Sequence, residues 1–231
     1  MLQVVCLKHG IKYGPEYVNK LYRMVSRNLT VPHRFTCFTE DSGGLDSNIE
    51  VIHLPTNAKR VGWWWKPFLF KADHFPTGDT ILYFDLDVVV VGDLTPIVDY
   101  KPGKFIGWED PGKIFHSNST LNSSVMRWNS GDGEEIHNVI EVNPAIVNKF
   151  PGDQDLIWHL CKDRIEFFPS DLICSYKWQV RTRGELIRNK DGWNFATVRN
   201  PVINPLTSVL VFHGTPDPHQ VSDQIIVDNW C

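Results

Sequence analysis

The chain has 231 residues, enough for one α/β domain with a full core, and 42% of them are hydrophobic. Its net charge of −4 provides no basic field that would attract nucleic acid, and no apolar stretch is as long as a membrane span. The five cysteines are scattered without a CxxC pair, which excludes the usual zinc and dithiol motifs. Free thiols and a start directly on a strand, without a signal peptide, predict a cytoplasmic protein.

In the first half, strand-like and helix-like segments alternate. Short β-branched and aromatic runs predict strands at 2–8, 34–39, 49–55 and 80–85. Apolar residues at helical spacing after Pro15 predict a helix over 15–29, and a second helix is predicted over 63–75. Because the strands are apolar almost throughout, they favour an α/β fold with a mostly parallel central sheet and helices on both faces.

The second half is less regular. Strands are predicted at 104–110, 121–129, 164–169 and 208–214, and a helix over 152–163 with Asp153 at or near its N-cap. Residues 170–207 are predicted to be mostly irregular. No internal repeat or low-complexity linker divides the chain, so one compact domain is expected.

The run ILYFDLDVVVVGDL places Asp85 and Asp87 at the end of the fourth predicted strand. Residues i and i+2 of a strand point to the same side, and open parallel sheets bind ligands beyond the carboxyl ends of their strands. Two neighbouring carboxylates repel each other unless a cation joins them. Their oxygens suit Mn²⁺ or Mg²⁺, which keep positions open for phosphate oxygens. A D-x-D triplet alone is a weak signal, but in this strand context it predicts a metal–diphosphate site.

Several segments together resemble one enzyme family. LYFDLDVVVVGDL resembles the D-x-D strand of GT-A-fold (Rossmann-like) nucleotide-sugar glycosyltransferases, in particular the family-8-like enzymes of the glycogenin and bacterial galactosyltransferase type. GWWWKPFLF resembles the family's helix with a donor-site lysine, and LNSSVMRWNSG its N-S-G-V segment. PGDQDLIW resembles its G-D-Q segment and VFHGTPDPH its H-G-x-x-K-P segment. The motifs agree in order and approximate spacing, and the likeness extends over most of the chain.

The resemblance implies a single GT-A domain over 1–231, with a nucleotide-binding half (1–110) and a half for the donor sugar and acceptor (111–231). It implies transfer of a sugar from a nucleoside-diphosphate sugar, UDP-sugars foremost, to a hydroxyl of a glycan, a lipid-linked or a protein acceptor. Family-8-like enzymes retain the anomeric configuration. No side chain here is an evident nucleophile, so retention would require front-face attack, whereas inversion would require a base such as Asp153 or Asp155.

Roles at individual positions follow from the same resemblance. Asp85, Asp87 and His213 would bind the metal, although a lone histidine at a strand end is more often structural. Asp153 and Gln154 would meet the donor sugar and the reacting face, and Asp155 is an acid/base candidate by its chemistry. The implied donor-binding residues are Lys66, Asp85, Leu86, Asn122, Ser123 and Gly214.

The nucleotide base needs a binding surface, and the carboxyl ends of the first two predicted strands provide one. The candidates there are Lys8, Tyr13, Thr39 and Asp41, and the ring of Tyr13 could stack on a base. The aromatic run Trp63–Trp65 could contact an acceptor sugar, but a helix stripe that packs on the sheet is the plainer interpretation.

Asp217 departs from the family pattern, because the H-G-x-x-K-P segment has a phosphate-binding lysine at this position. A carboxylate would repel a phosphate. Either the turn is shifted, or another cation takes over; the candidates are Lys66, which we expect first, and Lys177, Arg181 or Arg183 in the segment SYKWQVRTR.

Two other functions fit part of the sequence. FDLD also opens the nucleophile motif of haloacid-dehalogenase-type phosphatases, with Asp85 as the nucleophile, but there it lies on the first strand, whereas three strands precede it here. A carbohydrate- or nucleotide-binding module that has lost turnover would fit the departure at Asp217. Dinucleotide oxidoreductases and P-loop NTPases are disfavoured, because no G-x-G-x-x-G or G-K-[ST] occurs.

Overall fold

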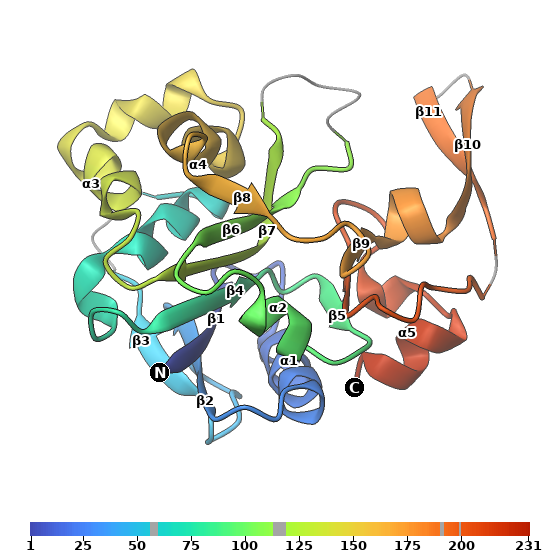
Figure 1. The fold of residues 1–231 in the computed structure, drawn as a ribbon, viewed down its shortest axis with the longest axis horizontal. Helices are drawn as coiled ribbons and strands as arrows, with labels where there is room; N and C mark the ends of the chain where they lie inside the picture. Colours follow the sequence, from blue (N-terminus) through green and yellow to red (C-terminus); the bar gives the residue numbers. More distant parts are fainter. Residues whose placement is uncertain (56–59, 113–118, 190–191, 199) are drawn as a thin grey trace.

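The computed structural model describes residues 1–55, 60–112, 119–189, 192–198 and 200–231, and gives the backbone alone for 182–189 and 192–197. Its central sheet has seven strands in the order β3-β2-β1-β4-β7-β6-β8 (Figure 1). The strands are β1 (Leu2–Lys8), β2 (His33–Thr39), β3 (Glu50–His53), β4 (Thr80–Phe84), β6 (Phe105–Glu109), β7 (Leu121–Asn129) and β8 (Ile165–Phe167). Neighbouring strands are parallel except that β7 is antiparallel to β4 and β6. The predicted α/β fold with a mostly parallel sheet is confirmed.

Helices cover both faces of this sheet. On β1, Val4 and Cys6 join the hydrophobic cluster that contains α1 (Pro15–Asn28), whereas Val5 and Leu7 join the cluster on the other face. That second cluster includes residues of α3 (Glu134–Val142) and α4 (Asp153–Cys161). Because successive side chains of a strand point to opposite faces, an apolar strand such as β1 needs a cover on each side.

A small second sheet extends the structure beyond the D-x-D triplet. It has the order β5-β12-β9, with β5 (Val88–Val90), β12 (Val209–Val211) and β9 (Ile173–Ser175). β12 is antiparallel to β5, and the amide of Phe212 donates to the Asp87 carbonyl at 2.9 Å. This pairing fixes the end of β12 beside the D-x-D triplet, although 125 residues separate Asp87 from Phe212.

The helix predicted over 63–75 is wrong in type and length. The segment Gly62–Phe70 is a 3-10 helix, η1, and a separate single turn, η2, spans Ala72–His74. Pro67 lies inside η1, where it has no N–H to donate to a preceding carbonyl and so disfavours a continuous α-helix. The 3-10 helix η1 nevertheless buries Lys66 and Phe68–Phe70 against the sheet.

The prediction that 170–207 is mostly irregular is also wrong. The segment contains β9, a π-turn (Tyr176–Val180) and the antiparallel hairpin of β10 (Thr182–Asn189) and β11 (Gly192–Thr197), which projects from the body in Figure 1. Helix α3, with two glutamates in its first turn, was not predicted either. The remaining elements are two short α-helices, α2 (Thr95–Asp99) and α5 (Gln224–Asn229), and two 3-10 helices, η3 (Pro144–Lys149) and η5 (Pro218–Gln220). Helix α5 lies near β5.

Two features bear on the predictions from composition. All five cysteines are free thiols, and Cys6 and Cys37 are buried in the core. Within the described ranges, no helix is long and apolar enough to cross a lipid bilayer.

Candidate active site

A cleft of about 430 Å³ opens beyond the carboxyl ends of β1 and β4. Side chains reach it from the loop after β1, from η1, from the D-x-D turn, from β7, from the N-terminus of α4 and from the segment after β12. The predicted site residues that line it are Tyr13, Lys66, Asp85, Leu86, Asp87, Asn122, Ser123, Asp153, Gln154, His213 and Gly214. The fold therefore gathers most of the predicted residues at one edge of the sheet.

Lys66 lies at the base of the cleft and joins three partners. Its ammonium is 3.0 Å from Asp85 Oδ1 and 3.2 Å from Asp153 Oδ2, and it donates to Ser123 Oγ at 2.9 Å. Burial alone would lower the pKa of Lys66, but the two carboxylates outweigh it and raise the pKa to about 12. Lys66 is therefore a permanent buried cation that connects η1, β4 and α4.

Asp85 is also held from its own strand. The hydroxyl of Tyr83, two residues earlier on β4, donates to Asp85 Oδ1, and burial raises the pKa of this phenol well above its ordinary value. The strand ends at Phe84, and Leu86 and Asp87 form a turn. The rule that residues i and i+2 point to the same side therefore does not extend to Asp87.

Asp87 faces the loop after β1. The Tyr13 hydroxyl lies 3.1 Å from Asp87 Oδ2 and 3.0 Å from Asp217 Oδ1, so one hydroxyl proton is shared between two carboxylates. Burial and the charge of Asp85 raise the pKa of Asp87 to about 7. Asp217, at the position of the expected lysine, thus adds negative charge close to Asp87.

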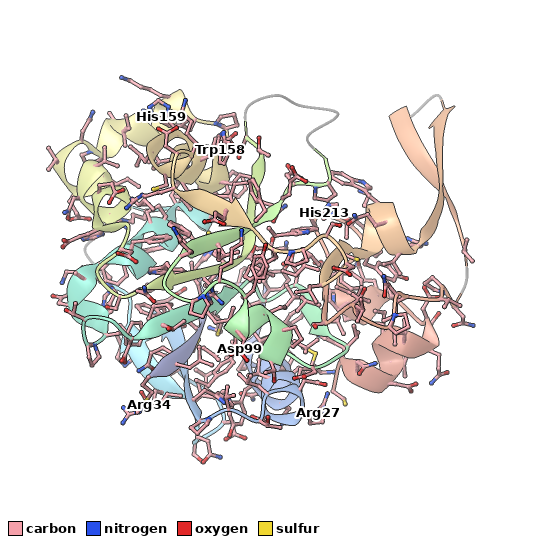
Figure 2. All side chains as sticks on the ribbon, in the orientation of Figure 1. Arg27, Arg34, Asp99, Trp158, His159 and His213 are labelled. Atoms are coloured by element: carbon pink, nitrogen blue, oxygen red, sulfur yellow. The ribbon has the colours of Figure 1, made fainter. Side chains whose placement is uncertain are left out.

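His213 lines the cleft from the segment just after β12. Figure 2 labels its side chain, which lies near the strand labelled β9 in Figure 1. Its Nε2 is hydrogen-bonded to Ser175 Oγ, and its ring packs 4.1 Å from the ring of Trp178. Burial and the nearby Lys177 lower the pKa of His213 to about 4. The imidazole is therefore neutral at pH 7, which is the form that binds metals.

The aspartate pair fits a hard divalent cation. Both groups offer carboxylate oxygens, and the pKa of Asp87 is raised first by burial and then by the charge of Asp85, which a bound cation would offset. No group of three histidine, cysteine, aspartate or glutamate side chains is assembled for a metal in the part of the chain that the structure describes. His213 would have to release Ser175 before its Nε2 could bind a metal.

Four residues predicted for catalysis or base binding do not line this cleft: Lys8, Thr39, Asp41 and Asp155. Lys8 and Thr39 are buried and both donate to the Asp41 carbonyl, at 3.2 and 2.9 Å. Asp155 lines a separate hollow beside Trp158 and His159, which Figure 2 shows well apart from His213. On a helix, residues i and i+2 are about 200° apart, so Asp153 and Asp155 cannot share a face of α4.

Other charged and aromatic residues of the cleft were not predicted. Tyr83 was detectable, because it precedes Asp85 by two positions on the same strand. His9 and Lys12 directly follow β1, at the same edge of the sheet. Burial lowers the pKa of His9, so this side chain adds no positive charge at pH 7.

The alternative phosphate partners lie at different places. The charge of Lys177 acts on His213, and Arg181 lines a neighbouring hollow with Tyr176 and Asp223. The side chain of Arg183 is outside the described residues. Of those candidates whose side chains the structure describes, only Lys66 lines the cleft itself.

Comparison with known proteins shows a likeness in structure alone. No family model and no curated protein matches the sequence. Among solved structures, an active-site mutant of LgtC is 15% identical with a TM-score of 0.65, over 96% of this chain and 91% of that one. The galactosyltransferase LgtC in complex with donor and acceptor sugar analogues is 16% identical with a TM-score of 0.61, over 94% and 88% of the two chains.

Two larger glycosyltransferases share the fold over part of their length. The bifunctional WbbM is 12% identical with a TM-score of 0.62, over all of this chain and 49% of its own. GlyE of Streptococcus pneumoniae TIGR4 is 15% identical with a TM-score of 0.56, over 75% and 47%. The chain thus spans about half the length of these two proteins and about nine tenths of LgtC. The seven-stranded α/β fold is that of the GT-A glycosyltransferases.

Proposed function

We propose that the protein is a metal-dependent glycosyltransferase that moves a sugar from a nucleoside-diphosphate sugar to an acceptor hydroxyl. The observation that carries this proposal is the cleft in which Asp85, Asp87, Asp153, Gln154 and His213 meet from three separate segments. The cleft lies where residues 1–110 and 111–231 meet. We assign nucleotide binding to the first half, and the donor sugar and acceptor to the second.

Mn²⁺ or Mg²⁺ would be held by Asp85 and Asp87, with His213 as the third candidate ligand. When bound there, the cation would neutralise charge on the diphosphate leaving group. The anomeric C–O bond breaks with its electron pair on the phosphate oxygen, the acceptor oxygen bonds to the same carbon, and the acceptor proton passes to the departing diphosphate. Leu86 and Gly214 line the cleft beside these groups and limit the space around the donor.

Asp153 is positioned to bind the donor sugar. Its Oδ2 accepts from Ser123 Oγ at 2.7 Å and pairs with Lys66, while no described residue donates a side-chain hydrogen bond to Oδ1. That oxygen can accept a hydrogen bond from a sugar hydroxyl. Because Lys66 neutralises its charge, Asp153 suits sugar binding better than proton abstraction. Gln154 and Asn122 supply further hydrogen-bonding groups along the same wall.

The phosphatase alternative is disfavoured by the surroundings of Asp85. A nucleophilic carboxylate must aim one oxygen in line at the phosphorus, whereas a metal ligand needs only a remaining lone pair on either oxygen. Here Oδ1 contacts Lys66 and accepts from Tyr83, and Oδ2 also accepts from Lys66, at 3.3 Å. A non-catalytic binding module stays as an outcome of the experiment below, and the cytoplasmic location stays a prediction.

A panel of nucleotide sugars with Mn²⁺, read by release of free nucleotide, tests the proposal, with UDP-sugars first. We expect release from at least one donor, and a loss of about 100-fold or more in Asp87→Asn. Asp163→Asn, an exposed aspartate just after α4, is the matched control and should keep full activity. Mn²⁺-dependent donor binding without release would identify a binding module. Neither binding nor release with any donor would refute the proposal.

A further inference from the structure

The cleft has more negative than positive charge. Asp85, Asp87 and Asp153 line it, and Asp217 lies beside Asp87 through Tyr13. The cations among the described lining residues are Lys66 and Lys12. A nucleoside diphosphate would add further negative charge, so a leaving group of this kind needs a cation that is not already neutralised.

Lys66 does not meet this need. A lysine ammonium has three N–H donors, and Asp85, Asp153 and Ser123 accept from or pair with it within 3.3 Å. Its side chain is only 6% exposed. If Lys66 turned to a phosphate, it would leave the buried Asp153 unpaired, which is costly. Lys66 therefore stabilises the cleft wall instead of meeting the leaving group.

Lys12 is the available cation. It is exposed in the loop between β1 and α1 and lines the same cleft. Its Nζ lies 4.4 Å from the centroid of the Tyr13 ring, and the hydroxyl of that ring is 3.1 Å from Asp87. Among the described residues, no carboxylate lies within ion-pair distance of the Lys12 ammonium. Its flexible stem and three free donors can follow a phosphate as it departs.

We propose that Lys12 binds the diphosphate of the donor and stabilises it as it leaves, the role that the resemblance assigned to a lysine where this chain has Asp217. The inference rests on the proposed transferase function. It places the phosphate-binding cation on the loop after β1, across Tyr13 from the Asp217 loop. Lys12 transfers no proton in this role. It donates charge-assisted hydrogen bonds to phosphate oxygens, whose negative charge increases as the anomeric bond breaks.

Inorganic diphosphate is the probe, because it represents the leaving group without requiring knowledge of the base. Its affinity in the presence of Mn²⁺ would be measured by calorimetry for the wild type, Lys12→Gln, Lys12→Arg and Lys162→Gln. Lys162 is an exposed lysine at the far end of α4, about 13 Å along the helix from Asp153, and serves as the matched control. We expect binding to weaken about ten-fold or more in Lys12→Gln and to change less than two-fold in Lys162→Gln.

Three further outcomes decide the inference. Lys12→Arg should keep most of the affinity, because guanidinium also pairs with phosphate. In a donor-turnover assay Lys12→Gln should lower kcat as well as raise KM, since the contact strengthens in the transition state. Equal diphosphate affinity in Lys12→Gln and wild type, or no diphosphate binding by the wild type, overturns the inference. Diphosphate binding that depends on Lys12, without turnover of any donor, supports it while contradicting the transferase proposal.

Discussion

The buried ion pair of Lys66 provides the most direct test of how the candidate site is held together. We predict that Lys66→Met destabilises the protein, because it removes the cation between Asp85 and Asp153. The side chains of Lys66 and Asp153 are only 6% and 9% exposed, so water can replace the lost partner only in part. Removing one member of such a pair costs about 3–5 kcal/mol.

For a chain of this length, that cost corresponds to a fall of about 6–20 °C in the unfolding midpoint. Urea unfolding at pH 7 would measure it. The matched control is Lys71→Met, which breaks an exposed pair with Asp73 whose side chains are 41% and 68% exposed. It should cost less than about 1 kcal/mol. A double variant, Lys66→Met with Asp153→Asn, should recover part of the loss, since it removes the unpaired charge.

The pH dependence has a defined sign. The pKa of Lys66 is about 12 in the folded protein and about 10.4 in an unfolded chain. The folded state therefore binds the proton more tightly, and the stabilisation is fully present below about pH 10.4 and is lost as the pH rises through 12. If Lys66→Met and Lys71→Met cost the same at pH 7, or if Asp153→Asn brings no recovery, the ion pair does not stabilise the cleft and the reasoning is refuted.

Three further changes test separate parts of the structure. Asp87→Asn should stabilise the metal-free protein by about 2–4 kcal/mol at pH 8 and not at pH 4. The pKa of Asp87 is about 7 in the folded protein and about 3.9 in an unfolded chain, so the wild type loses stability as the pH rises between these values. Urea unfolding in EDTA across that pH range measures the difference. Trp63→Ala should raise the KM for a sugar acceptor about three- to ten-fold and leave donor hydrolysis unchanged, because Trp63 is 55% exposed at the cleft and its ring can pack against a sugar. Equal acceptor KM values in the variant and the wild type would contradict this prediction. Arg127→Leu should lower the free energy of unfolding in urea by about 2–4 kcal/mol, because the buried guanidinium donates to the carbonyls of Ile97 and Lys101 at 2.9 and 2.7 Å. A loss below about 1 kcal/mol would show that water takes the place of the guanidinium.

The sequence predicted the features that depend on local pattern. The run from Leu2 to Lys8 was predicted as a buried strand, and because the ends of parallel strands meet at one edge of a sheet, the segments after β1 and β4 bring Tyr13 and Asp85 to one cleft. Helix α1 was also predictable, from its proline start and its apolar stripe. Asp155 could have been placed away from Asp153 by helical geometry alone.

Features that depend on long-range pairing could not be predicted from local pattern, and only the resemblance suggested His213 as a partner of Asp85 and Asp87. His213 lies beside the D-x-D turn because the three-residue strands β5 and β12 pair, and a run of four valines does not reveal that it leaves the main sheet. The cost of burying Lys66 depends on how closely Asp153 and Ser123 approach it, which is a property of three distant segments. Likewise, nothing near Lys12 in the sequence distinguishes it from a solvated loop lysine.

The two aspartates of the D-x-D triplet therefore have different roles in the charge balance of the cleft. Asp85 lies at the end of β4, where Lys66 and Tyr83 already satisfy it from one side. Asp87 lies in the turn that follows, where Tyr13 offers a single proton to it and to Asp217. Burial and the repulsion from Asp85 leave Asp87 with a pKa of about 7, so Asp87 is where a cation would stabilise the cleft most. A metal and Lys12 of the β1–α1 loop are two sources of this positive charge, and a nucleoside diphosphate would lie where both can reach its phosphates.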